Sequence, residues 1–480
     1  MKLFKLLALT IFFLHALHAA DTPQASQKAK RPNVLFILTD DQSYATMSCT
    51  GSSFMKTPNL DRLARDGALF SNLILATSVC APSRAAFMTG TYNWKNGVYA
   101  NAAKWDPKNV ILAQMMQEVG YATAHIGKWH CGGLKDPQPG NDHWFVAPGQ
   151  GRYEDPTINI NGQEQKFQGK YLTTLTTDET IKFISKDHGS KPFLIWYAMK
   201  AVHGGRVPEA KYADRFKDMG VRELYGDKVA DLVKITRNPD GSVKAADQLP
   251  KGVEDPFDGK PLEGPEGALE YERHYYRLLL SVEDSIGRIF AALENEGILD
   301  DTLIIFTSDN GYFHGEGGKT AGKRVPYEPA IRVPMMVHYP RQVKGGQVID
   351  RIVSNVDLVP AVLDFCSISI PKQVQGMSWK PLVTGKPDTP WREAFVYTMP
   401  SGRMHKAPVA LRTEHDKLIL TPPSTEEYYI LTNDPWEEHN LAADPKYMAR
   451  ISEMKKQLLD EMVKIDHPGI EMYKKWPLPE

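Results

Sequence analysis

The segment Asn33-Val34-Leu35-Phe36-Ile37-Leu38-Thr39-Asp40-Asp41 decides the fold, because it is an apolar run of strand length that ends in two acidic residues. Apolar residues occupy both faces of the run, which is typical of a strand in a parallel sheet covered by helices on both sides. Three more runs have this character, and polar side chains follow each of them. They are Tyr121–Ile126, Phe193–Met199 and Thr302–Thr307.

Helices are predicted between these strands. Thr57-Pro58 begins one helix, which Gly67 ends, Val110–Val119 forms another, and Ala268–Glu296 forms a long amphipathic one. Strands that alternate with helices predict an α/β fold. Gly204–Gly267 is rich in Pro, Gly and charged residues, and we expect an insertion or a loop region on the substrate side.

A smaller α+β subdomain is predicted at the C-terminus, because the sequence changes character after Trp391. Short strands separated by turns precede a final helix. The strands are Ala394–Tyr397, Lys417–Leu420 and Tyr428–Leu431, and the helix is Pro445–Ile465. The predicted division is therefore a signal peptide at 1–20, a catalytic domain at 31–390 and a C-terminal subdomain at 391–480.

The first twenty residues have the pattern of a signal peptide. Lys2 and Lys5 precede the apolar run Leu6–Leu17, and small residues end at Ala20. No later run of 18 apolar residues occurs, so we expect no membrane anchor. No N-x-S/T sequon occurs either, which favours a bacterial periplasmic or secreted protein over a lysosomal one.

Composition excludes several classes of protein. The 480 residues are 42% hydrophobic and 24% charged with a formal net charge of −1, so neither disorder nor bulk nucleic-acid binding is expected. The four cysteines are too few for a disulfide framework and include no C-x-x-C pair. They are Cys49, Cys80, Cys131 and Cys366.

Polar residues follow all four predicted strands. Because the carboxyl ends of parallel strands meet at one sheet edge, their side chains are expected to lie together. Carboxylate and amide oxygens suit Ca²⁺ or Mg²⁺ better than zinc. Taken singly, such groups are more often turns, helix caps or solvated side chains, and it is their joint placement at one sheet edge that favours a site. The residues are Asp40 and Asp41, then Lys128 and His130, then His203, and finally Asp309 and Asn310.

The most specific motif is Ser78-Val79-Cys80-Ala81-Pro82-Ser83-Arg84-Ala85-Ala86-Phe87-Met88-Thr89-Gly90. It resembles the first signature of the type I sulfatases of the alkaline phosphatase superfamily. The stretch Gly120-Tyr121-Ala122-Thr123-Ala124-His125-Ile126-Gly127-Lys128-Trp129-His130 resembles their second signature. The resemblance extends from the first strand to Tyr429–Pro435, where Ile430 replaces an Asp of the family pattern.

This resemblance implies an alkaline-phosphatase-like mixed or parallel sheet flanked by helices, with the smaller C-terminal subdomain. It also implies that Cys80 becomes formylglycine through a formylglycine-generating or anaerobic sulfatase-maturing enzyme, with Pro82 and Arg84 completing the recognition core. Ca²⁺ would be held by Asp40, Asp41, Asp309 and Asn310. The sulfate pocket would be lined by Arg84, Lys128, His130, His203 and Lys323, the last placed by the match of Gly322–Glu328 to G-K-x-x-x-Y-E.

The chemistry of a sulfate ester fits these roles. A thiol that attacked sulfur would form a thiosulfate adduct that does not readily release sulfate. An aldehyde hydrate, by contrast, has a second hydroxyl that can expel sulfate. Calcium would act as Lewis acid and template, and the cations would stabilise developing negative charge. The proton donor to the leaving group is His203 or Lys323, and His130 is a candidate for moving the hydrate proton. The match at His203 is weaker, because Gly205 stands where the family often has Pro.

The expected substrate is a sulfated carbohydrate, such as a glycosaminoglycan, mucin or algal glycan fragment. His314, Lys319 and His405 are candidate substrate-binding residues, and the loop Ser401–His405 is expected to shape the leaving-group pocket. Two alternatives remain open: a formylglycine-dependent phosphodiester or phosphonate monoester hydrolase, and an inactive glycan-binding protein. Tryptophans could stack on sugars, although packing in the core is the favoured interpretation for each; they are Trp105, Trp144 and Trp436.

Overall fold

A computed structural model of the chain describes residues 31–132, 136–220, 264–314, 322–386, 388–399 and 407–477. The predicted signal peptide, Lys319 and the loop with His405 lie outside the described residues, as does most of the Gly204–Gly267 region. No helix among the described residues is long and apolar enough to cross a membrane.

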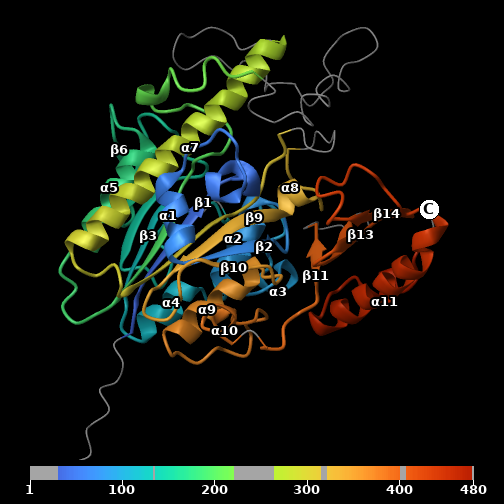
Figure 1. Cartoon of the computed structure of the whole chain (residues 1–480). Helices are drawn as coiled ribbons and strands as arrows, with labels where there is room; N and C mark the ends of the chain where they lie inside the picture. Colours follow the sequence, from blue (N-terminus) through green and yellow to red (C-terminus); the bar gives the residue numbers. More distant parts are fainter. Residues whose placement is uncertain are drawn as a thin grey trace, which may run out of the picture. The chain divides into compact units, whose positions relative to one another are not determined.

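The four strands predicted from sequence form the centre of a ten-stranded sheet (Figure 1). They lie side by side in the order β8 (Thr302–Ser308), β1 (Asn33–Thr39), β7 (Phe193–Ala198) and β3 (Ala122–Lys128), all parallel. Thr39 at the end of β1 is in register with Ser308, so both strands end at one level. The parallel core of the predicted fold is therefore confirmed.

Six flanking strands complete this sheet and make it mixed, and the sequence analysis identified none of them. The strand next to β8 is antiparallel to both of its neighbours, and the outermost pair at the other edge is antiparallel as well. In the order β10-β2-β9-β8-β1-β7-β3-β4-β5-β6 they are β10 (Gln347–Ile349), β2 (Ala68–Ile74), β9 (Arg332–His338), β4 (His143–Ala147), β5 (Thr157–Ile160) and β6 (Gln163–Lys166).

Helices cover both faces of the sheet, because alternate side chains of the central strands are buried on opposite sides. Phe36 and Leu38 of β1 belong to one hydrophobic cluster, and Leu35 and Ile37 belong to another. The first cluster includes α2 (Cys80–Thr89), α4 (Leu112–Glu118) and α9 (Leu358–Phe365), and the second includes α1 (Pro58–Asp66), α5 (Leu172–Ile184) and α7 (Gly264–Asn295).

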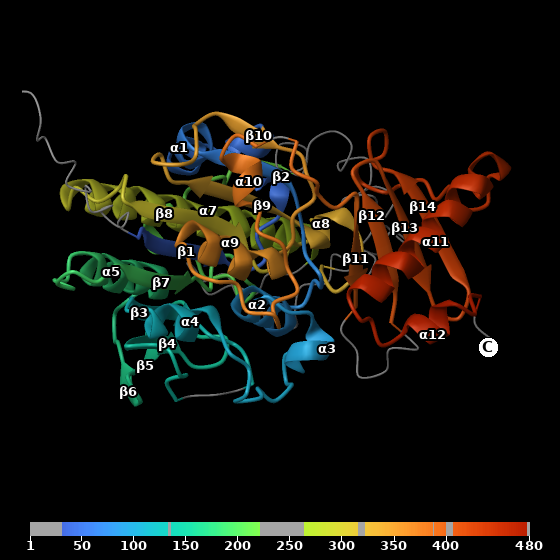
Figure 2. The same cartoon turned by 90° about the horizontal axis from the view of Figure 1, so that it is seen from below.

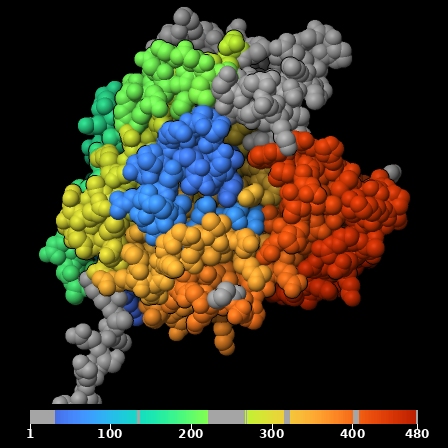
Figure 3. Space-filling view, in the orientation of Figure 1, coloured from blue at the N-terminus to red at the C-terminus, as the bar shows by residue number. Residues whose placement is uncertain are grey.

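The C-terminal residues form a separate four-stranded antiparallel sheet with α11 (Met448–Lys464) on one face (Figure 2). Its other face packs on the main part of the chain, where Phe395 and Tyr397 contact the cluster of Ile74 and Ile331. Figure 3 shows this C-terminal region, in red, against residues of the main part. The strands are β11 (Ala394–Thr398), β12 (Val409–Thr413), β13 (Asp416–Thr421) and β14 (Thr425–Ile430).

The subdomain has the predicted character, with two differences in detail. Strand β12 was not predicted, and the α-helix begins at Met448 rather than Pro445, because Pro445–Tyr447 forms a 3-10 turn. The boundary at residue 391 stays a prediction, because Pro32–Glu480 behaves as one compact unit.

Candidate active site

Segments far apart in the sequence meet at the carboxyl ends of the central strands. Asp40 and Asp41 follow β1, and Asp309 follows β8. One oxygen of each of these carboxylates and Cys80 Sγ all lie within 4.8 Å of one another. Asn310, the fourth predicted metal ligand, contacts Asp309 and Cys80, so the structure brings together all four predicted ligands and the predicted nucleophile.

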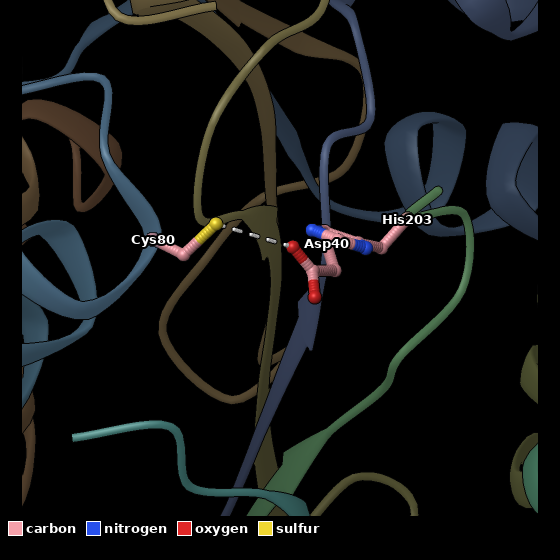
Figure 4. Close-up of side chains that lie close together, drawn as sticks. All are labelled: Asp40, Cys80 and His203. Carbon is pink, nitrogen blue, oxygen red and sulfur yellow. Dashed lines mark hydrogen bonds between the residues drawn. The ribbon is translucent and has the colours of Figure 1, made fainter. Parts of the chain in front are cut away.

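Cys80 is the first residue of α2, and all ten residues of that helix are buried. The N-terminus of a helix carries a partial positive charge that favours a bound anion or an oxyanion. Cys80 Sγ donates to Asp40 Oδ1 at 3.7 Å, and Figure 4 shows Asp40 between Cys80 and His203. Burial, together with Asp309 and Asp40, raises the pKa of Cys80 to about 12, so an unmodified thiol here would be a weak nucleophile at neutral pH.

Three cations pair with the three carboxylates, and two of them, Arg84 and Lys128, are buried. Arg84 Nε lies 2.7 Å from Asp309 Oδ2, and Lys128 Nζ contacts Asp40. Arg84 is also fixed by donating from Nη1 to the carbonyl of Lys128 at 3.0 Å. Charges removed from water require partners of this kind, and the cations are placed where an anionic group could also bind.

Lys323 completes this set from a loop far along the chain. Its Nζ lies 2.6 Å from Asp41 Oδ1 and 2.8 Å from Cys80 Sγ. Burial opposes the charge of Lys323, but Asp41 and Cys80 more than compensate and raise its pKa well above 10.5. Lys323 therefore carries a proton beside the sulfur of Cys80.

The backbone adopts left-handed conformations next to several of these side chains. Asp41 has φ 64° and His130 has φ 60°, and such conformations cost energy and cluster at functional sites. Gly127 has φ 105°, and a Cβ there would lie 1.9 Å from the carbonyl oxygen of Ala198. Gly205 has φ 70°, which a proline cannot adopt, so the departure from the family pattern near His203 has a physical reason.

His130 is connected to the cations of the site through Gln150. Gln150 Oε1 accepts from Lys128 Nζ at 2.6 Å, and Gln150 Nε2 lies 2.9 Å from His130 Nε2. Burial, Lys128 and Arg84 lower the pKa of His130 to about 2, so its ring is neutral. If Gln150 donates to Nε2, the proton of His130 is on Nδ1, a buried atom with no hydrogen-bond partner among the described residues.

His203 is held by its loop and by acidic neighbours. Its Nε2 lies 3.8 Å from Asp41 Oδ2, and its backbone carbonyl accepts from the Tyr153 hydroxyl at 2.9 Å. Burial lowers the pKa of His203, although Asp40 and Asp41 oppose that shift.

The residues present fit a hard divalent cation. Asn310 Nδ2 donates to Asp309 Oδ1 at 2.9 Å and to Cys80 Sγ at 3.3 Å, whereas Asn310 Oδ1 is buried with no hydrogen-bond partner among the described residues. A buried carbonyl oxygen without a donor is costly, and one beside three carboxylates matches the all-oxygen coordination of Ca²⁺. Burial and Asp40 raise the pKa of Asp309 to about 6, although Arg84 opposes the shift, as expected where carboxylates are crowded in a buried site.

His314 pairs with an acidic residue of α7. Its Nδ1 lies 2.9 Å from Glu272 Oε2, and its side chain is 3% exposed. Trp105 and Trp144 are buried in the core, in agreement with the packing interpretation. The predicted role of His314 in substrate binding stays a prediction.

Sequence reasoning missed Gln150 and Lys200. Gln150 lies in a loop after β4, a strand that was not predicted, so nothing placed it near the site. Lys200 follows β7 and is 7% exposed, with Nζ 4.8 Å from the centre of the Tyr153 ring. Burial and Lys128 lower the pKa of Lys200 to about 8. Its position three residues before His203 was the only available signal.

Comparison with known proteins defines the class. The Sulfatase family model matches residues 32–368, and the model for the C-terminal region of N-sulphoglucosamine sulphohydrolase matches residues 315–464. The chain therefore belongs to the sulfatase family and is a sulfatase with the alkaline-phosphatase-like fold, as the sequence motifs predicted.

The particular relatives are carbohydrate sulfatases. An N-acetylglucosamine-6-O-sulfatase of Bacteroides thetaiotaomicron is 32% identical over 91% of this chain and 85% of its own. An ulvan-active sulfatase of Formosa agariphila is 25% identical over 92% and 83%. A solved protein in complex with its substrate D-glucosamine-2-N,6-O-disulfate is 31% identical with a TM-score of 0.79, covering 92% of this chain and all of the other.

Proposed function

We propose that this sulfatase is an exported enzyme that removes a 6-O-sulfate from a glucosamine-type sugar, with formylglycine at position 80 and Ca²⁺ as its cofactors. The observation that carries the proposal is the convergence of Asp40, Asp41, Asp309 and Cys80 within 4.8 Å at the N-terminus of a buried helix. The choice of sugar is supported by the similarity to an N-acetylglucosamine-6-O-sulfatase at 32% identity and to a structure bound to D-glucosamine-2-N,6-O-disulfate at 31% identity. Export is supported by the character of residues 1–20.

The cofactors would supply a geminal diol as nucleophile and a Lewis acid for a sulfate oxygen. The ion would be held by Asp40, Asp41, Asp309 and Asn310, whose buried Oδ1 has no other hydrogen-bond partner among the described residues. Arg84 and Lys128 would hold the sulfate oxygens by charge-assisted hydrogen bonds, because both side chains are fixed by acidic partners and cannot rotate away.

Proton transfer falls to Lys323, His203 and His130. Lys323 Nζ carries a proton next to position 80, and His203 Nε2 lies 3.8 Å from Asp41 Oδ2, so each can donate to the oxygen of the departing sugar. His130 can donate from Nδ1 to a sulfate oxygen while Gln150 occupies Nε2. These fixed groups act without reorganisation as charge develops.

The test is sulfate release by protein produced together with a formylglycine-forming enzyme. Glucosamine and N-acetylglucosamine carrying sulfate at positions 3 or 6, and galactose-type sugars carrying it at 4 or 6, would be compared, with Cys80→Ala as control. We expect the 6-sulfated glucosamines to have the highest kcat/KM. Release from another position with none from glucosamine 6-sulfate would refute the sugar assignment.

The same protein tests the two alternatives. A phosphonate monoester hydrolase of Agrobacterium radiobacter shares the fold, with a TM-score of 0.70 at 20% identity, so phosphate diesters and phosphonate esters belong in the panel. A higher kcat/KM on these than on any sulfate would overturn the proposal. A free thiol at Cys80 in protein from the native host would favour the inactive glycan-binding alternative.

A further inference from the structure

A single carboxylate of α7 lies between two loops of the site. Glu272 Oε1 is 2.8 Å from Arg206 Nη1, and Glu272 Oε2 is 2.9 Å from His314 Nδ1. Arg206 follows the His203 loop, and His314 lies in the segment between Asn310 and Lys323. Glu272 therefore bridges the two loops that supply the two candidate proton donors.

Aromatic rings of α7 and its neighbours hold this bridge in place. The guanidinium of Arg206 lies 4.4 Å from the centre of the Tyr271 ring and 5.0 Å from those of Tyr275 and Tyr312. Arg206 is 4% exposed. A desolvated cation among rings gains energy from their faces, but it still needs an anion, and Glu272 is the acidic side chain that pairs with it.

The hydroxyls of the same tyrosines extend the contact to the backbone of the site. The Tyr271 hydroxyl accepts from the Gly205 amide at 3.2 Å, two residues after His203. The Tyr275 hydroxyl donates to the carbonyl of Asp41 at 3.0 Å and accepts from the amide of Ser43 at 3.1 Å. One face of α7 thus fixes the loops after β1, β7 and β8.

We propose that Glu272 is a positioning residue for leaving-group protonation, acting through Arg206 on the His203 loop and through His314 on the residues beside Lys323. The amide of Phe313, next to His314, donates to the carbonyl of Gly322, next to Lys323, at 2.6 Å. Glu272 touches neither the nucleophile nor the predicted metal ligands, so its effect is on where the donors lie. The proposal rests on the proposed function, because it presumes a sugar alkoxide that must be protonated as it departs.

Sugar and aryl leaving groups differ in their need for a proton. A sugar alkoxide is a strong base and needs a proton in the transition state, whereas 4-nitrophenolate departs without one. Loss of donor positioning should therefore slow sugar sulfates far more than aryl sulfates. A general weakening of the site, of the metal site or of the fold would slow both substrates equally.

The experiment compares Glu272→Gln with wild type on glucosamine 6-sulfate and on 4-nitrophenyl sulfate, using matured enzyme in excess Ca²⁺. We expect kcat on the sugar sulfate to fall about 30-fold, within the range for a misplaced catalytic group, and kcat on the aryl sulfate to fall less than threefold. KM should change little for either. An equal fall on both substrates, or no fall on either, would overturn the proposal.

Two further variants keep the test decisive if Glu272→Gln folds poorly. His314→Phe keeps a ring among the tyrosines but removes the hydrogen bond to Glu272. Its kcat should also fall more on the sugar sulfate than on the aryl sulfate, but by a smaller factor than in Glu272→Gln. Glu270→Gln is the matched control, because Glu270 lies on the same helix and pairs with Arg273 at 2.8 Å; it should leave the ratio of the two rates unchanged. A changed ratio in Glu270→Gln would count against Glu272.

Failure of this inference is distinguishable from failure of the proposed function. The wild-type rate on glucosamine 6-sulfate tests the function, whereas the ratio of variant to wild-type rates across leaving groups tests Glu272. If wild type does not accept that sugar, simple alkyl sulfates serve as the poor leaving groups.

Discussion

Lys323 Nζ lies 2.8 Å from Cys80 Sγ, although 243 residues separate the two in sequence. The same ammonium lies 2.6 Å from Asp41 Oδ1. A fixed cation between the nucleophile position and a predicted metal ligand can stabilise the sulfate oxygens and also supply a proton. The fold, rather than any local motif, creates this contact.

Replacing Lys323 should therefore damage catalysis more than binding. We expect Lys323→Met to lower kcat by about 10²–10³, the usual cost of removing one electrostatic contact to a transition state. Lys323→Arg should recover little of the lost kcat, because a planar guanidinium cannot replace a compact ammonium between Asp41 and position 80. Steady-state kinetics on a sugar sulfate checks this, and a change confined to KM would contradict it.

Position 80 should be essential for turnover. Cys80→Ala should abolish turnover with the fold intact, because the small side chain fits a helix whose residues are all buried. Mass spectrometry of the wild-type peptide should show an aldehyde in place of the thiol. Turnover comparable to wild type in Cys80→Ala would refute the mechanism, and an unchanged melting temperature would confirm that the loss is chemical.

Metal dependence should follow the ligand set. Chelation should abolish activity and Ca²⁺ should restore it, since Asp40, Asp41 and Asp309 offer only oxygen ligands. We expect Asn310→Ala to weaken Ca²⁺ binding by about 10²-fold, at the upper end of the effects seen around metal sites. The rise of melting temperature with Ca²⁺ measures this without reference to activity. Full activity in chelator would rule out the ion.

Gln150 should matter although no motif contains it. Gln150→Leu removes the group between Lys128 and His130, and we expect kcat to fall about 10-fold as His130 loses its fixed orientation and Lys128 loses one of its acceptors. The matched control is Gln165→Leu on the exposed strand β6. Steady-state kinetics should give a lower kcat for Gln150→Leu than for Gln165→Leu. Equal kcat values in the two variants would show that Gln150 plays no part in catalysis.

His467 should make stability depend on pH. It is 4% exposed, and burial lowers its pKa from 6.5 to about 4. Between pH 4 and pH 6.5 the unfolded chain binds a proton at His467 that the folded chain does not. The stability that neutral His467 contributes is therefore fully present above pH 6.5 and is lost as the pH falls toward 4. At pH 5 the loss amounts to about 2 kcal/mol of unfolding free energy.

Denaturant unfolding of His467→Gln and wild type at pH 7 and pH 5 tests this. The variant should be less stable at pH 7, because packing against Trp94 is lost, but its loss on acidification should be smaller than that of wild type. Parallel losses in the two proteins would show that His467 binds a proton in the folded state as readily as in the unfolded chain.

The central strands could be predicted because each is an uninterrupted apolar run ending in polar residues. Strand β9 could not, because Pro334 interrupts it and removes a hydrogen-bond donor. Strand β2 was missed because Ser71 and Asn72 lie inside it, at a register irregularity between Phe70 and Leu73. In both cases tertiary pairing outweighed local pattern.

By itself, the sequence determined the family, the parallel core, the nucleophile position and the residues expected to surround it, because long contiguous motifs and buried strands leave a local signature. Only the tertiary structure decided which groups meet: Lys323 with Cys80, Gln150 with His130, and Glu272 with both Arg206 and His314. Those contacts join residues from different helices and loops. Their partners are set by sheet order and helix packing, which bring distant segments together without any marker in the local sequence.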